Sequence, residues 1–184
     1  MNRRLLIGLF LGLSFVQIMV PLSMILRRES TLRTGESFRF KTEPVDPYDA
    51  FRGRYVALRI KEDSVEDYKG TRLTSGQSVY AQIAVDEAGY AKFTAITVDK
   101  PRGAAFIQAK VRYISSGIVR LGLPFDRYYM EETAAPRAES AYREHTRQAK
   151  PDAYVLVRVK DGFAVLEALY LGDRRIEDAV DNEK

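Results

Sequence analysis

Hydrophobic positions in this chain follow two different patterns, one near the N-terminus and one in the rest of the sequence. Residues 5–26 contain no charged side chain, and two arginines stand on each side of them. At about 1.5 Å per residue, a helix of this length spans roughly 33 Å, enough for the ~30 Å hydrocarbon layer of a bilayer. From Phe38 onward, apolar and polar residues alternate, which is typical of half-buried β-strands. The sequence therefore predicts a mainly β protein, with an N-terminal transmembrane helix followed by an antiparallel β domain.

The apolar segment is longer than the ~7–15-residue core of a cleaved signal peptide, and it lacks a clear small-x-small cleavage site. We therefore interpret residues 1–26 as a signal anchor that crosses the membrane once. Arg3 and Arg4 before the segment are balanced by Arg27 and Arg28 after it, so the terminal amine tips the orientation toward a cytoplasmic N-terminus, which would leave residues 27–184 outside the cytoplasm. Gly8 and Gly12 form a G-x-x-x-G step, at which a second helix can approach closely.

The alternating segments predict a series of short strands after a juxtamembrane linker at residues 27–34. Such a series favours an antiparallel sandwich or barrel. The clearest alternation occurs in residues 38–42, 56–60, 79–85, 93–95, 107–113 and 155–159.

Two predicted hairpins, residues 79–98 and 153–171, resemble each other closely enough to suggest internal repetition. Tyr80 aligns with Tyr154, and the second hairpin lacks one residue, in the turn. Its turn sequence, Asp161-Gly162, is typical of a two-residue type I′ turn, whose central residues need positive φ. The alternative is that amphipathic hairpins simply resemble one another.

A weaker similarity relates residues 53–58 to residues 116–121. If the repetition is real, the β domain at residues 35–176 consists of two similar lobes, residues 35–100 and 101–176.

A helix is predicted inside the second lobe, at residues 136–149. Pro136 suits a first helical position, and Pro151 prevents the helix from continuing. One face carries Ala138, Ala141, Tyr142, His145 and Ala149. Residues 177–184 are rich in acids, and we expect them to form a frayed tail.

Composition excludes several kinds of chemistry. The chain has no Cys, which excludes a disulfide scaffold and a thiolate zinc site. The formal net charge is +4, and half of it comes from the two arginines before the apolar segment, so a nucleic-acid partner is not expected. His145 is the single histidine, and its place on a predicted helix face favours a packing role. We expect no catalytic residue, cofactor or metal ion.

The segment at residues 45–60 holds the strongest candidate for binding. Its arginines are interleaved with aromatic side chains, an arrangement that can bind an anionic group through guanidinium contacts and ring stacking. The alternative is a solvated strand face whose arginines pair with nearby carboxylates. The arginines are Arg52, Arg54 and Arg59, the aromatic residues are Tyr48, Phe51 and Tyr55, and the carboxylates are Glu43, Asp46 and Asp49.

This segment resembles the signature of the GDYXXLXY family of bacterial membrane-anchored proteins. Gly53, Tyr55 and Leu58 match the signature, whereas Arg54 replaces its Asp and Ile60 replaces its final Tyr. The segment at residues 127–132 also resembles the family, and the similarity covers nearly the whole chain. The resemblance implies an anchor in the bacterial inner membrane, a periplasmic domain and multi-spanning membrane proteins as neighbours. Our candidate binding residues are Arg52, Gly53, Arg54, Tyr55, Arg59, Arg127, Tyr129 and Glu131.

We therefore predict a non-enzymatic, extracytoplasmic accessory or interaction module that associates with an integral membrane protein. The alternative is an envelope hydrolase or a protease similar to signal peptidases, which use a Ser nucleophile and a Lys base. For such an enzyme, Ser23 at the outer end of the span would be the nucleophile, with Lys41 or Lys61 as the base.

Overall fold

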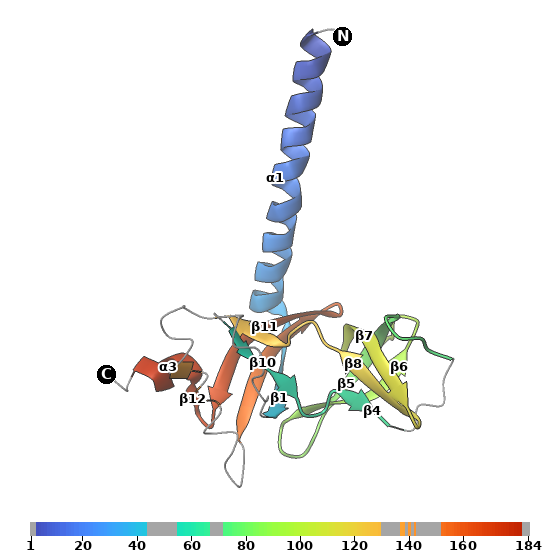
Figure 1. The fold of residues 1–184 in the computed structure, drawn as a ribbon, viewed down its shortest axis with the longest axis vertical. Coiled ribbons are helices and arrows are strands. Elements are labelled where there is room, and N and C mark those ends of the chain that lie inside the picture. The colour runs from blue at the N-terminus through green and yellow to red at the C-terminus, as the bar shows by residue number, and fades with distance from the viewer. Residues whose placement is uncertain are drawn as a thin grey trace.

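An N-terminal helix, α1 (Arg3–Thr34), stands away from a β domain in the computed structural model (Figure 1). The helix continues through Pro21 and through residues 27–34, where the sequence predicts a linker. No part of its apolar window is buried, and its length and composition suffice to cross a membrane. The structure describes residues 3–43, 55–66, 72–129, 137–138, 140, 142 and 152–181.

The described strands form two five-stranded antiparallel sheets and one two-stranded ribbon. The proximal sheet, next to α1, has the order β12-β11-β10-β1-β3, the distal sheet has the order β4-β8-β7-β5-β6, and β2 pairs with β9. The strands are β1 (Glu36–Glu43), β2 (Tyr55–Ala57), β3 (Arg59–Ile60), β4 (Ser64–Val65), β5 (Ser78–Val85), β6 (Ala91–Thr97), β7 (Phe106–Ser115), β8 (Ile118–Gly122), β9 (Arg127–Tyr129), β10 (Ala153–Lys160), β11 (Phe163–Leu171) and β12 (Arg174–Arg175). The mainly β prediction is therefore confirmed.

Both sheets contribute to one hydrophobic core. In β1 the alternation of side chains buries Phe38, Phe40 and Thr42. The Phe40 ring stacks on Phe93 of β6, with ring centroids 5.4 Å apart, and contacts Phe125 at 5.6 Å. Since Phe40 belongs to the proximal sheet and Phe93 to the distal sheet, the two sheets are held together by shared aromatic packing.

The sheets divide the chain differently from the lobes expected at residues 35–100 and 101–176. Strand β5 pairs with β7, and β1 pairs with β10, so each sheet takes strands from both expected lobes. The alternation of apolar residues is the same in all these strands. It therefore specifies which face is buried, but it leaves the choice of neighbour to tertiary packing.

The two hairpins β5–β6 and β10–β11 share an irregularity. In each, the second strand carries one extra residue, Thr94 in β6 and Glu167 in β11. Thr94 lies opposite the link between Gln82 and Ile83, and Glu167 lies opposite the link between Leu156 and Val157. A β-bulge re-aims the side chain that it contains, so both hairpins turn one residue out of the regular alternation.

The segment that resembles the family signature, residues 55–60, is divided into β2 and β3 because it changes its pairing partner. Residues 55–57 pair with β9, and residues 59–60 pair with β1. Between them, the backbone N–H of Leu58 donates to the carbonyl oxygen of Asp126 at 2.9 Å. The backbone is therefore hydrogen-bonded through the change from one neighbour to the other.

Two segments that the sequence assigns to a helix and to a tail are described in part. Within the expected helix at 136–149, residues 137, 138, 140 and 142 are helical, and Ala138 and Tyr142 are buried; His145 lies outside the described residues. The acidic segment is not frayed where the structure describes it, because it contains helix α3 (Ile176–Asp181). Ile176 is fully buried and anchors that helix to the core.

Candidate functional site

The two family-like segments chosen from the sequence meet in the β2–β9 ribbon. Tyr55 lies opposite Tyr129, and Ala57 lies opposite Arg127. Three candidate binding residues are thus brought onto one pair of strands from distant parts of the chain. The other candidates near this ribbon, Arg52, Gly53, Arg54 and Glu131, lie outside the described residues.

Arg59 and Ile60 follow the ribbon on β3, and they have different environments. Ile60, which stands where the family signature has a tyrosine, is buried opposite Thr42 and belongs to the core. Arg59 is exposed opposite Glu43, and it acts electrostatically on Asp63. The structure therefore groups Arg59 with residues of the distal sheet, which sequence reasoning did not include in the site.

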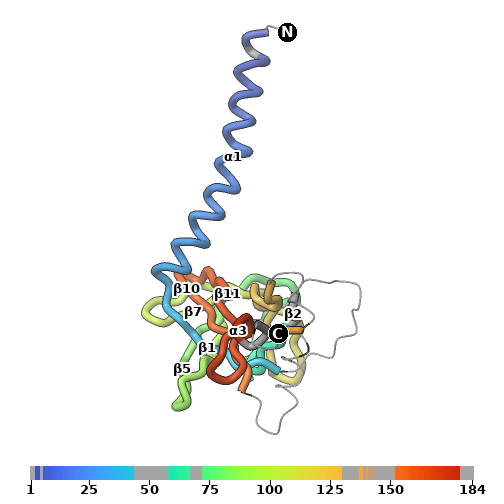
Figure 2. The backbone as a smooth tube through the Cα atoms, turned by 90° about the vertical axis from the view of Figure 1, so that its left-hand side faces the viewer, coloured from blue at the N-terminus to red at the C-terminus, as the bar shows by residue number. Residues whose placement is uncertain are grey.

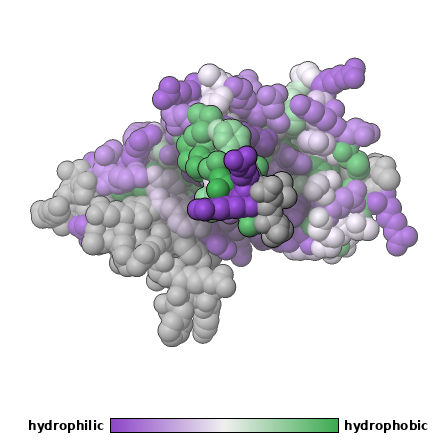
Figure 3. Space-filling model, turned by 90° about the horizontal axis from the view of Figure 1, so that it is seen from above, coloured by the Kyte–Doolittle hydropathy of each residue, from purple (hydrophilic) through white to green (hydrophobic). Residues whose placement is uncertain are grey.

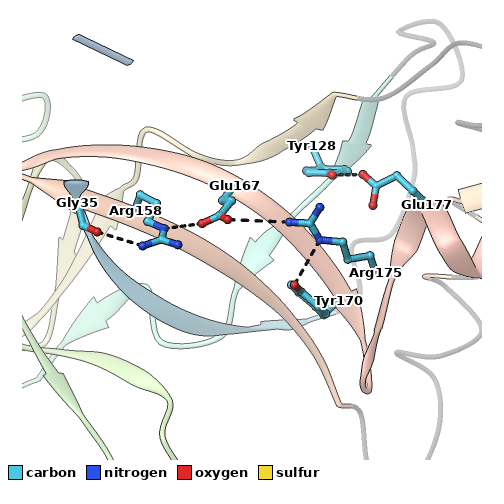
Figure 4. A network of polar contacts seen from close by, with 7 residues as sticks. All are labelled: Gly35, Tyr128, Arg158, Glu167, Tyr170, Arg175 and Glu177. Carbon is cyan, nitrogen blue, oxygen red and sulfur yellow. Dashed lines mark hydrogen bonds and ion pairs between the residues drawn. The ribbon is translucent and has the colours of Figure 1, made fainter. Parts of the chain in front are cut away.

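Tyr128, the residue between Arg127 and Tyr129, connects the ribbon to α3. Its hydroxyl donates a hydrogen bond to a carboxylate oxygen of Glu177, the second residue of α3 (Figure 4). Burial and the bond to Glu177 both raise the pKa of Tyr128 above its ordinary value, so the phenol remains protonated and a donor. The sequence analysis missed this contact. The signal that could have found it is Ile176, an apolar residue at the start of an acidic segment.

A second polar network crosses the outer face of the proximal sheet (Figure 4). Arg158 donates to the carbonyl oxygen of Gly35 at 3.2 Å, and its Nε lies 2.5 Å from Glu167. The other carboxylate oxygen of Glu167 faces Arg175 at 3.9 Å, and Arg175 donates to the Tyr170 hydroxyl at 3.3 Å. Glu167 is the bulged residue of β11, and the bulge places its carboxylate between two guanidinium groups.

Helix α1 is fastened to the β10–β11 hairpin at its C-terminal end (Figure 2). Lys160 donates to the hydroxyls of Ser30 and Thr34, both at 2.8 Å. The Arg27 guanidinium lies 4.3 Å from the centre of the Phe163 ring. These contacts dock the last two turns of the helix directly on the proximal sheet.

The passage from α1 to β1 requires a glycine. A Cβ atom added to Gly35 would overlap the carbonyl oxygen of Thr31, to which the Gly35 N–H donates at 2.8 Å. The helix therefore continues into the sheet after a single residue. Seen along α1, the coloured part of the domain surface around the apolar helix is mostly hydrophilic (Figure 3).

The residues considered for a Ser–Lys enzyme have other contacts. The Ser23 hydroxyl donates to the carbonyl oxygen of Val20 at 2.7 Å, within α1. The Lys41 ammonium lies 4.3 Å from the centre of the Tyr90 ring. The Ser23 hydroxyl is therefore bonded within its own helix, whereas Lys41 lies in the β domain against the ring of Tyr90.

An apolar N-terminal helix of membrane-spanning length, docked on the proximal sheet of a domain with two antiparallel sheets, defines a protein class with one candidate span and one folded β domain. Within that class, the chain belongs to the GDYXXLXY protein family, whose model matches residues 17–169. The match runs from the middle of α1 to β11 and includes the β2–β9 ribbon. No curated protein and no solved structure matches the chain.

Proposed function

We propose that this protein is a membrane-anchored accessory module, whose β domain lies outside the cytoplasm and associates with an integral membrane protein. The observation that carries the proposal is the direct docking of α1 on the proximal sheet. A tether would need only a flexible linker after the span. A docked helix instead gives the β domain one orientation relative to the bilayer, which suits a contact with a partner fixed in the same bilayer.

Confinement to the membrane supports this reading on energetic grounds. Two proteins held in one bilayer meet at a high effective concentration, so a modest interface is sufficient for association. The apolar residues of the docked helix are followed by only about two turns, roughly 12 Å, before β1 begins. The β domain is therefore held close to the membrane surface, within reach of the extramembrane loops of a multi-spanning partner.

The span itself offers a place for a second helix. Its large apolar side chains are exposed along its length, and open space surrounds Gly8 and Gly12, with no other atom within 4 Å of an added Cβ. Small residues four positions apart allow another helix to approach closely in a bilayer. We infer that this face of α1 contributes to the association.

Site-specific photo-crosslinking in native membranes tests the partner. Phe15 lies on the same side of α1 as Gly8 and Gly12, and Phe10 lies on the opposite side. A photoreactive phenylalanine at Phe15 should yield a discrete adduct with a membrane protein, and the matched probe at Phe10 should yield much less. Equal adducts from both positions, or none from either, would contradict the proposal.

A phosphatase fusion tests the orientation separately. Alkaline phosphatase joined after Lys184 should be active if the β domain lies outside the cytoplasm, because the enzyme needs an oxidising compartment. A cytoplasmic reporter at the same position should be inactive. The reverse pattern would place the β domain inside the cell, whatever the crosslinking shows.

We also propose that the β domain contains two equivalent halves that exchange strands. One support is a pair of matching hydrogen bonds, from Leu58 N–H to Asp126 and from Leu121 N–H to Asp63. Leu58 and Leu121 are separated in sequence by the same number of positions as Asp63 and Asp126. The β2–β9 ribbon accordingly corresponds to the β8–β4 pair.

The strand neighbours support the same equivalence. In the proximal sheet β11, β10, β1 and β3 follow one another, and in the distal sheet β6, β5, β7 and β8 do so. The first half then comprises β1 to β6 and the second comprises β7 to β11. Each half gives its hairpin, β5–β6 or β10–β11, to the other half's sheet.

A further inference from the structure

We propose that Arg59, Arg112 and Arg120 form a binding site for a soluble phosphate group, beside the buried carboxylate of Asp63. The site lies where β3, β7 and β8 approach the turn that contains Asp63. It is separate from the β2–β9 ribbon. The proposal does not depend on the membrane partner proposed above.

Asp63 is held firmly in place. Its backbone carbonyl accepts the N–H of Leu121 at 2.8 Å, and its side chain is 10% exposed. The Nε of Arg120 lies 3.4 Å from the Asp63 Oδ1. This distance marks an ion pair, but Nε is buried and has no hydrogen-bond partner among the described residues. A strong, desolvated donor thus remains unsatisfied at the centre of the cluster.

The cluster carries more positive than negative charge. Burial raises the pKa of Asp63 above its ordinary value, and Arg120, Arg112 and Arg59 oppose that rise, with Glu43 adding to it. Three guanidinium groups thus act electrostatically around two carboxylates, of which only Asp63 is buried, and Arg120 is the one paired with it at 3.4 Å. Arg59 and Arg112 are exposed and can turn toward a ligand, and guanidinium groups match the oxygens of phosphate with paired hydrogen bonds.

In the equivalent half proposed above, Arg120 and Arg59 have no charged counterpart. Ser64 lies opposite Arg120, and at the equivalent pair Arg127 lies opposite Ala57. Arg120 therefore corresponds to Ala57. In the same way Arg59, opposite Glu43, corresponds to Gly122, opposite Lys110.

The equivalent turn forms the same backbone hydrogen bond in a different charge environment. Asp126 accepts from Leu58 N–H as Asp63 does from Leu121, but its side chain is 57% exposed and faces its chain neighbour Arg127 at 3.7 Å. The backbone thus closes this turn whether or not arginines surround the carboxylate. Asp63, which is buried, and Glu43 account for two of the three positive charges, so one positive charge is left in excess, and binding an anion is a role that suits this excess.

The position of the cluster indicates a soluble ligand. Strand β1 starts beside α1 and extends for about 25 Å to Glu43, the residue opposite Arg59. In Figure 1, β4, which follows Asp63, lies on the side of the domain away from the N-terminal end of α1. Headgroups of the bilayer that holds α1 are therefore beyond the reach of these side chains.

Titration of the full chain with inorganic phosphate tests the site. In detergent micelles at constant ionic strength, phosphate should shift the Nε–H NMR signals of Arg59, Arg112 and Arg120 saturably. Arg112→Ala should weaken binding by about tenfold, since it removes a charge-assisted donor. The matched control is Arg102→Ala, which removes an equally exposed arginine from the β6–β7 loop and should leave the affinity unchanged.

The opposite results are equally informative. Shifts that never saturate, or equal weakening of phosphate binding by Arg112→Ala and Arg102→Ala, would mean that phosphate is attracted only by the general positive charge. Either result would contradict the proposed site. A bilayer experiment separates the two sources of phosphate. If the same three signals shift in phosphatidylglycerol nanodiscs relative to phosphatidylcholine nanodiscs, with no phosphate added, the assignment to a soluble ligand is wrong.

Discussion

The proximal and distal sheets each contain a hairpin with a one-residue bulge in its second strand, β10–β11 and β5–β6, but the turns of those hairpins differ. The β10–β11 turn has two residues, Asp161 and Gly162, with φ of 51° and 81°. Gly162 packs on the Phe106 ring of the distal sheet, and its carbonyl accepts the Gln108 N–H at 2.9 Å. A tight turn is thus required where the hairpin end must fit against the other sheet.

The β5–β6 turn is longer and has open space around it. The carboxylate of Asp86 accepts the N–H groups of Ala88 and Tyr90 at 3.0 and 2.9 Å, and nothing lies within 4 Å of a Cβ added to Gly89. The pairing of the strands therefore sets the shape of each sheet, whereas the turns adapt each hairpin to what lies next to it. The proximal sheet holds α1, and the distal sheet carries Arg112 and Arg120, two members of the arginine cluster.

The largest expected effect concerns the core that the two sheets share. Phe40→Ala should lower the free energy of unfolding by about 3–5 kcal/mol, because Phe40 of the proximal sheet is fully buried against the rings of Phe93 in the distal sheet and of Phe125. Hydrogen exchange should accelerate in both sheets together. Exchange confined to the proximal sheet would show that the sheets unfold independently. Val85→Ala, at an exposed apolar position, should change stability by less than about 0.5 kcal/mol.

The next effect compares the two hairpin turns directly. Gly162 and Gly89 have nearly the same φ, 81° and 82°, so alanine meets the same backbone strain at both positions. Gly162→Ala should also collide with the Phe106 ring and cost about 3 kcal/mol, against about 1 kcal/mol for Gly89→Ala. Chemical denaturation of the two variants measures the difference. Equal costs would mean that the proximal turn does not press on the distal sheet.

A smaller effect on stability depends on pH and concerns the contact between Tyr142 and Glu43, the last residue of β1. The buried Tyr142 hydroxyl donates to the Glu43 carbonyl oxygen at 2.9 Å, and burial raises the pKa of Tyr142 to about 12. An unfolded tyrosine ionises near pH 10, so this contribution is complete below pH 10 and is lost as pH rises through 12.

Tyr142→Phe isolates that contribution. At neutral pH it should cost about 1 kcal/mol for the lost hydrogen bond, and it should remove about 2 kcal/mol of the alkaline loss of stability. Melting curves between pH 8 and about pH 12 compare the variant with the natural chain. Parallel curves would show that Tyr142 ionises normally in the folded protein.

The smallest effect concerns the helix joint. Lys160→Ala should reduce global stability by under about 1 kcal/mol, because its hydrogen bonds to Ser30 and Thr34 are partly exposed. Its main consequence should be local. Spin-label distances between α1 and the distal sheet should broaden, and unchanged distance distributions would show that the remaining contacts alone hold the joint.

Sequence periodicity predicted the burial of the strands well, but beyond the segments 79–98 and 153–171 it did not predict which strands are neighbours. Phe38, Phe40 and Thr42 are buried as alternation requires, because side-chain direction is a local property of a strand. The pairing of β5 with β7 depends on contacts between distant segments. Several partners satisfy the same alternation, so the pattern alone leaves the choice open.

The candidate site shows the same limit. The segments containing Tyr55 and Tyr129 were both recognised from family-like residues, but only the fold places them on paired strands. The grouping of Arg59 with Arg112 and Arg120 around Asp63 had no local signal at all. Residues 27–34 were expected as a linker because they are polar. They remain helical through docking on the proximal sheet and the Glu29–Arg33 pair at 2.6 Å.

The single-residue connection between α1 and β1 also fixes the direction in which the β domain points around the axis of α1. Each residue of an α-helix turns the chain by about 100° and advances it by about 1.5 Å. One residue inserted between Leu26 and Arg27 would rotate the whole domain by about 100° around the axis of the apolar part of α1, and would move it along that axis by only about 1.5 Å. Four inserted residues would restore the original direction of the domain to within about 40° and would displace the domain by about 6 Å along the helix axis. The rotation of the domain around the helix axis and its displacement along that axis can thus be varied almost separately. The membrane partner that we propose would contact a domain that points in one direction.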